Sequence, residues 1–89
     1  MSFTALGPRL SELGSRLGDR LTEPRRGWYS EFLEVGEYVL ALEMLADWLS
    51  EEEVPIPDGA RTEALALASE MGIHERVSGA LSLCPPATT

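Results

Sequence analysis

The chain has 89 residues, a net charge of −8 and a single cysteine. A folded domain of this length has a surface of roughly 5,000 Å², which suffices for one modest core and disfavours a deep active site. The 15 acidic residues are set against 7 arginines and no lysine. Nucleic acids and anionic membranes both require a basic binding surface, so we expect neither as a partner.

The first predicted element is a helix over about residues 8–21. Its leucines recur at steps of three or four, which places them on one helical stripe: Leu6, Leu10, Leu13, Leu17 and Leu21. Gly14 and Gly18 each weaken a helix by up to about 1 kcal/mol. We therefore expect this helix to depend on packing against the rest of the domain.

A break is predicted over residues 22–27, where Pro24 and Gly27 interrupt the helical pattern. A short second helix should follow from Trp28 to Val35, with Ser30 as a candidate cap. Gly36 then suits the end of that helix.

The strongest helical pattern covers about residues 37–52. It is apolar around most of its circumference, which is typical of a central helix with neighbours on several sides. Glu43, Asp47 and Glu51 form the solvent row, because residues four apart lie on one face.

Pro55 and Pro57 mark a linker before a helix over about residues 59–71, with Asp58 as its N-cap and Gly72 after its end. A last short helix is predicted over residues 74–81. Nothing alternates with period two, so the fold class is all-α: a small antiparallel bundle of four to five helices. Residues 1–81 should form a single helical domain and residues 82–89 a flexible C-terminal tail.

The charge distribution is uneven. No basic residue lies between Arg26 and Arg61, and the gap holds nine carboxylates: Glu31, Glu34, Glu37, Glu43, Asp47, Glu51, Glu52, Glu53 and Asp58. Like charges four apart on a helix cost a few tenths of a kcal/mol per pair, and most exposed helices interleave Lys or Arg. Such a row is either plain solvated surface or faces a cationic partner. We expect the N-terminal arginines to fold back onto this segment as surface ion pairs, with head-to-tail self-association as the alternative.

Catalysis and metal binding are disfavoured. Glu43 and Asp47 could form a carboxylate pair, but general acid–base chemistry needs pKa values separated by burial, and these two lie on the predicted solvent face. Glu70 and His74 have metal-ligand spacing, but Gly72 interrupts the helix between them. Cys84 fits a reducing cytoplasm better than a catalytic role. We expect no enzyme activity, no cofactor and no metal.

The stretch EFLEVGEYVLALEMLADWLSEEEVPIP, residues 31–57, resembles the small α-helical immunity proteins of the Maf and contact-dependent-inhibition type. The matching positions are Glu31, Phe32, Gly36, Glu37, Tyr38, Leu40, Ala41, Leu42, Glu43, Leu45, Asp47, Leu49, Glu51, Val54, Pro55 and Ile56. The resemblance implies a cytoplasmic protein that binds and neutralises a cognate toxin domain, often a nuclease with a basic cleft. The expected partner-binding residues are Glu34, Glu37, Tyr38, Glu43, Asp47, Glu51, Glu52 and Glu53.

Within this set, Glu31, Glu34 and Glu37 are expected to serve helix starts and turns. Glu43, Asp47 and Glu51–Glu53 have no such internal explanation, and we expect the cationic partner to dock on them. Two alternatives stay open. The Gly36-x-Tyr38-x-x-Ala41 pattern also resembles part of a tetratricopeptide repeat, which would bind a peptide in a groove, although no second copy follows. An exposed apolar helix face could also pair two copies as a homodimer.

Overall fold

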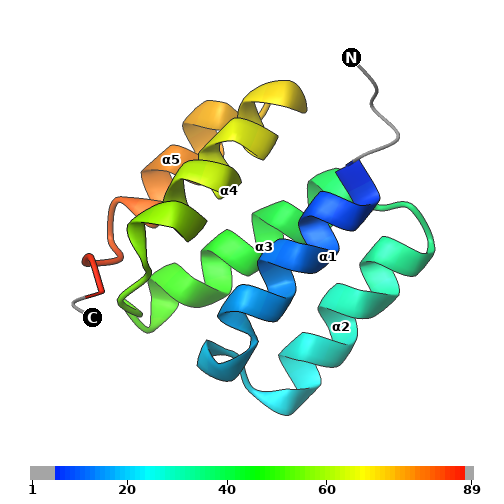
Figure 1. Ribbon diagram of the computed structural model, residues 1–89, viewed down its shortest axis with the longest axis horizontal. Coiled ribbons are helices and arrows are strands. Elements are labelled where there is room, and N and C mark those ends of the chain that lie inside the picture. Colours follow the sequence, from blue (N-terminus) through cyan, green and yellow to red (C-terminus); the bar gives the residue numbers. More distant parts are fainter. Residues whose placement is uncertain (1–5, 88–89) are drawn as a thin grey trace.

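The computed structural model describes residues 6–87, which form five α-helices and one short 3₁₀ helix. They are α1 (Leu6–Leu17), η2 (Gly18–Arg20), α2 (Glu23–Glu34), α3 (Tyr38–Glu51), α4 (Asp58–Glu70) and α5 (His74–Leu81). Consecutive α-helices run in opposite directions, with α1 beside α2, α4 beside α5, and α3 running between the two pairs (Figure 1). Over the described range the all-α prediction is confirmed, and the one β-type contact is an isolated bridge between Ile56 and Pro86.

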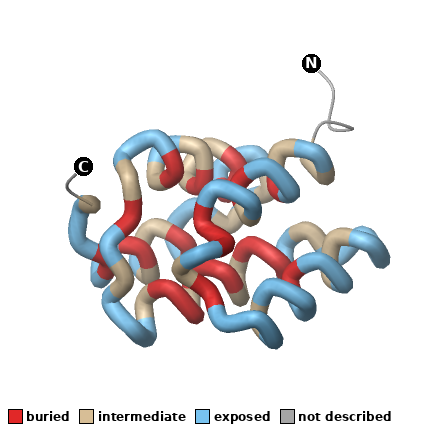
Figure 2. Tube along the Cα trace, turned by 60° about the horizontal axis from the view of Figure 1, so that its bottom comes forward, coloured by how far each residue is buried: buried red, intermediate tan, exposed pale blue. Residues whose placement is uncertain are grey.

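The core lies where α3 meets the other helices, and the buried positions follow the inner faces of the tube in Figure 2. Three leucines of the predicted N-terminal stripe, Leu10, Leu13 and Leu17, are at most 1% exposed. The central position predicted for α3 is confirmed, because it buries more residues than any other helix: Ala41, Leu42, Leu45, Ala46, Trp48 and Leu49. The accessible surface of 5122 Å² agrees with the size expected from chain length.

The break predicted over residues 22–27 is wrong. The α2 helix begins at Glu23, and the Thr22 hydroxyl caps it by accepting a hydrogen bond from the Arg25 backbone N–H at 3.4 Å. Pro24 falls in the first helical turn, where its missing N–H has no helical partner to lose. Ser30, the expected cap, therefore lies inside the helix.

Gly14 allows α1 and α2 to approach closely. A Cβ on Gly14 would lie 2.5 Å from Cε2 of Tyr29, which is closer than real Cβ contacts. The Tyr29 ring is buried, and its hydroxyl donates a hydrogen bond of 2.6 Å to the carbonyl oxygen of Leu10. Burial also raises the pKa of Tyr29 well above its ordinary value. The glycine that weakens α1 in isolation thus makes the space for its main neighbour on α2.

The flexible tail predicted over residues 82–89 differs from what the structure shows for residues 82–87. Cys84 is buried, and two backbone hydrogen bonds join the segment to Ile56: the Ile56 N–H donates to Pro85 at 3.0 Å and the Ala87 N–H donates to Ile56 at 2.9 Å. Arg61 also donates to the carbonyl oxygens of Leu81 at 2.8 Å and Cys84 at 2.6 Å. Residues 82–87 therefore pack onto the linker before α4, and residues 88–89 lie outside the described part.

Candidate protein-binding surface

The α3 carboxylates Glu43 and Asp47 face an arginine of α5. Arg76 Nε lies 3.3 Å from Glu43 Oε2, and Arg76 Nη2 lies 2.7 Å from Asp47 Oδ2. Arg76 was not expected here, because it is far from both carboxylates in sequence and follows the basic-free gap. The helical hairpin α4–α5 brings it back over α3.

A second arginine neutralises part of the C-terminal end of α3. Arg25 Nη2 lies 3.1 Å from Glu51 Oε1, and Arg25 Nη1 lies 3.9 Å from Glu52 Oε2. The same guanidinium stacks over the Trp48 ring at 5.7 Å. The expectation that Glu43, Asp47 and Glu51–Glu52 lack internal partners is therefore wrong, although such surface pairs contribute only about 0–1 kcal/mol each.

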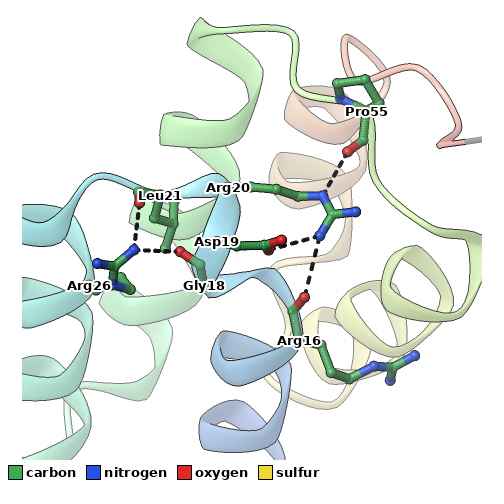
Figure 3. A network of polar contacts seen from close by, with 7 residues as sticks. All are labelled: Arg16, Gly18, Asp19, Arg20, Leu21, Arg26 and Pro55. Atoms are coloured by element: carbon green, nitrogen blue, oxygen red, sulfur yellow. Dashed lines mark hydrogen bonds and ion pairs between the residues drawn. The ribbon is translucent and has the colours of Figure 1, made fainter.

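The other N-terminal arginines only partly follow the expected return to the acidic gap. Arg9 pairs instead with Glu63 at 3.0 Å and Glu70 at 2.7 Å on α4, and hydrogen bonds to these carboxylates hold its pKa above the ordinary value. Figure 3 shows the corner after α1, where Arg26 donates to the carbonyls of Gly18 and Leu21 at 2.8 and 2.9 Å. In the same view Arg20 donates to the Pro55 carbonyl at 3.1 Å and pairs with Asp19. These arginines join elements of the fold.

Five acids of the basic-free gap are exposed and have no ion pair among residues 6–87: Glu31, Glu34, Glu37, Glu53 and Asp58. Glu37 precedes α3, but its side chain makes no capping hydrogen bond. Helix ends thus do not account for Glu37 as expected. The first three of these acids lie within the last turn of α2 and the connection to α3, which we call the α2–α3 corner (residues 31–37).

Glu53 holds a backbone conformation that usually belongs to glycine. Gly36 and Gly72 end α2 and α4 with φ near +80° and +76°, as predicted, whereas α3 ends with Glu53 at φ +48°. The following N–H closes all three ends in the same way; at α3, Val54 donates to Leu49 at 3.0 Å. A left-handed conformation costs a non-glycine residue roughly 1–2 kcal/mol. The chain retains an exposed carboxylate at a position where glycine is the more stable residue.

Tyr38 is the least accessible of the predicted partner-binding residues in this region. Its hydroxyl lies 2.9 Å from the position that a Cβ on Gly7 would take, so the ring packs on the start of α1. It is half-buried and packs against the core cluster. Tyr38 thus belongs to the junction of α1 and α3.

Exposed apolar side chains gather on the same two helices. Trp28, Val35, Val39 and Leu40 are 51%, 72%, 41% and 38% exposed, and the one other large hydrophobic residue of the described chain in this class is Leu83. An open depression of about 550 Å³ at the corner is lined by Glu31, Phe32, Glu34, Val35, Glu37 and Leu40. These apolar residues were not predicted to form a site, although the four- and three-residue steps from Trp28 to Phe32 and Val35 place them on one face of α2.

A tetratricopeptide-like adaptor would need a concave apolar groove for its peptide. A depression of about 320 Å³ lies between α1 and α2, but serines and glycines contribute most of its rim: Ser11, Gly14, Ser15, Gly18 and Ser30. Arg26 at its end is already hydrogen-bonded to backbone carbonyls. The concave apolar groove expected for that alternative does not occur at this place.

Residues with catalytic or metal-binding chemistry lie apart. No three His, Cys, Asp or Glu side chains within residues 6–87 are placed to hold a metal ion. His74 is exposed, and burial raises the pKa of the Cys84 thiol. None of the helices described is long and apolar enough to span a bilayer.

Comparison with known proteins gives no assignment, because no family model, no curated protein and no solved structure matches the chain. The resemblance of residues 31–57 to immunity proteins therefore stays a prediction from the sequence.

Proposed function

We propose that this protein is an immunity protein, which binds a cognate toxin domain and neutralises it without catalysis of its own. The observation that carries the proposal is the α2–α3 corner, where Glu31, Glu34 and Glu37 are exposed without a basic partner in the described chain, beside exposed apolar side chains. A buried apolar centre with a charged rim is the usual composition of a protein interface. The sequence resemblance supplies the class of partner, a toxin domain with a basic surface.

The charges favour a corner-centred interface over one centred on α3. Two arginines, Arg25 and Arg76, lie against four of the predicted acids, so those four contribute a net charge of 4 − 2 = 2 negative units. The corner acids keep their full charge. Unpaired carboxylates attract a basic partner over a longer range, which raises the association rate at low salt.

A standard interface covers about 800 Å² on each partner. This is roughly a sixth of the 5122 Å² surface of the chain. Among the predicted partner-binding residues, Glu34 and Glu37 therefore supply the main charges at the corner. Glu53 is unpaired but lies beyond the opposite end of α3, and Glu43, Asp47, Glu51 and Glu52 are paired with arginines.

The direct test is co-purification and stopped-flow binding with the toxin domain encoded next to this gene. We expect the pair Glu34→Lys with Glu37→Lys to slow association about tenfold at low salt and to flatten its salt dependence. A matched control, Glu12→Lys with Glu75→Lys, changes the net charge equally at exposed positions of α1 and α5. Equal slowing by both pairs would show that only total charge matters, and absence of any complex would end the proposal.

Reversal of Glu43 and Asp47 is a poorer test of the site. Lysines there would face Arg76 across 2.7–3.3 Å contacts, so the helices α3 and α5 would repel each other. Loss of binding could then follow from loss of folding. Glu→Gln and Asp→Asn changes at these two positions avoid the repulsion and should alter association less than changes at the corner.

A further inference from the structure

Exposed apolar side chains and the half-buried Phe32 form a stripe along the seam between α2 and α3. Trp28, Phe32 and Val35 lie on one face of α2, and Leu40 at the start of α3 lines the same depression as Phe32 and Val35. At the other end, Trp28 contacts Trp48 with ring centroids 6.1 Å apart. We call these four residues (Trp28, Phe32, Val35 and Leu40) the seam stripe.

The charges beside the seam stripe are of one sign at the corner. Glu31, Glu34 and Glu37 line or border the depression that holds Val35 and Leu40, and no arginine pairs with them in residues 6–87. At the Trp28 end, Arg25 is already paired with Glu51 and Glu52. A partner must therefore bring apolar side chains for the stripe and positive charge for its rim.

We infer that the seam stripe docks a cationic amphipathic helix of the partner protein, with its apolar face on Trp28, Val35 and Leu40 and its Lys or Arg residues against Glu31, Glu34 and Glu37. The inference rests on the proposed function only for the identity of the protein that carries this helix. The depression of about 550 Å³ at the corner lies at one end of the stripe and offers a recess for apolar side chains, which is how amphipathic helices bind other proteins. From Trp28 to Val35 the stripe is about 10 Å long, or two turns of helix.

A second copy of this chain is the less suitable occupant. It would bring its own net charge of −8, and with it the same unpaired glutamates, to a face that is already acidic. Like charges across an interface oppose association. A basic helix instead neutralises the rim as it covers the stripe.

The experiment uses a synthetic 14-residue helix with leucines at i, i+3, i+4 and i+7 and lysines on both flanks. Trp28 is 51% exposed and Trp48 only 5%, so docking should shift tryptophan emission to shorter wavelength, mainly through Trp28. Val35→Ser with Leu40→Ser should weaken binding at least tenfold, because it removes two apolar contacts. These positions are 72% and 38% exposed, so the variant should fold, which circular dichroism checks.

The matched control for the apolar contacts is Leu83→Ser, which removes a leucine of 59% exposure from the C-terminal segment and should leave binding unchanged. For the rim, Glu31→Gln with Glu34→Gln should weaken binding several-fold, whereas Glu12→Gln with Glu75→Gln should not. Two further peptides complete the set: one with glutamates in place of the lysines, and one of the same composition without an apolar face. Neither should bind.

The inference is overturned if the lysine peptide does not bind, or if either control peptide binds as well as it does. It is also overturned if light scattering shows a dimer that the Val35→Ser, Leu40→Ser variant abolishes, because a second copy would then cover the stripe. The toxin domain separates the two proposals. Unchanged toxin binding by the Val35→Ser, Leu40→Ser variant rejects the seam stripe and keeps the proposed function, whereas peptide binding without any toxin complex keeps the stripe and rejects the function.

Discussion

Replacement of Gly14 by alanine should destabilise this protein, although it places the best helix former in the middle of a helix. In an isolated helix the change is favourable by roughly 0.5–1 kcal/mol. In the fold the new methyl group would lie 2.5 Å from Cε2 and 3.0 Å from Cδ2 of Tyr29, whose ring is 4% exposed and held by its hydrogen bond to Leu10. Overpacking of this kind costs about 1–3 kcal/mol. The net expectation is a loss of about 0.5–2 kcal/mol in the free energy of unfolding.

Gly27→Ala is the matched control, because Gly27 lies within α2 and a Cβ there would meet nothing within 4 Å. That variant should gain about 0.5–1 kcal/mol. Thermal unfolding followed by circular dichroism measures both variants, and for a domain of this size 1 kcal/mol corresponds to about 4–8 °C in Tm. The two variants should therefore move Tm in opposite directions.

The steric cause can be tested separately with a smaller side chain at position 29. If the ring of Tyr29 opposes the methyl group, Tyr29→Leu should cost less in the Gly14→Ala background than in the wild type, which is a favourable coupling in a double-mutant cycle. An equal gain in Tm for Gly14→Ala and Gly27→Ala, or strict additivity with Tyr29→Leu, would refute the reasoning.

Three further outcomes follow from the contacts. Removal of residues 82–89 should cost about 2–4 kcal/mol in urea unfolding, because it uncovers Ile56 and removes the buried Cys84 together with the hydrogen bonds of the segment. Tyr29→Phe should cost about 1–2 kcal/mol at pH 7 through the lost hydrogen bond to Leu10. It should also remove part of the alkaline loss of stability described next. Glu53→Gly should raise the free energy of unfolding by about 1 kcal/mol, because it relieves the left-handed conformation at φ +48°, and should slow toxin association if Glu53 serves binding.

The alkaline behaviour depends on the buried tyrosine. Burial raises the pKa of Tyr29, so the folded state keeps its proton when the unfolded state, with a pKa of about 10, loses it. Tyr29 therefore does not lower the free energy of unfolding below about pH 10. Above that pH the free energy of unfolding falls by up to about 1.4 kcal/mol per pH unit. Burial also raises the pKa of Cys84, so the free energy of unfolding begins to fall at a lower pH than Tyr29 alone would cause. This part of the fall is the same in wild type and in Tyr29→Phe.

Each of these predictions has an outcome that would contradict it. A truncated protein as stable as the full chain would support the flexible tail that the sequence suggested. Parallel pH profiles of wild type and Tyr29→Phe above pH 10 would contradict the burial of the phenol. A Glu53→Gly variant without added stability would show that the end of α3 is not strained.

The sequence by itself determined the helices, because their signals are local. The leucine steps of three and four define α1, the apolar circumference of α3 places it at the centre, and Gly36 and Gly72 end their helices in the left-handed conformation that only glycine adopts freely. Boundaries were predicted less well: α1 ends at Leu17 rather than near residue 21, and Asp58, the predicted N-cap, is the first residue of α4 and makes no capping hydrogen bond. The larger error, at α2, came from a proline that suits a first turn as well as it suits a break. Periodicity and the glycines at helix ends therefore sufficed for the fold class.

Tertiary structure alone decided which charges have partners and which apolar residues do not. Arg76 and Arg25 reach the acids of α3 from α5 and α2, and no spacing within residues 27–60 could show this, because ion pairs join residues that only the packed helices bring together. The same packing leaves Trp28, Val35 and Leu40 exposed and places Gly14 against Tyr29. The acidic gap was visible in the sequence, but only the structure shows which of its acids have no ion pair within residues 6–87, since pairing depends on distance in space. They are Glu31, Glu34 and Glu37 at the α2–α3 corner, and Glu53 and Asp58 beyond the end of α3.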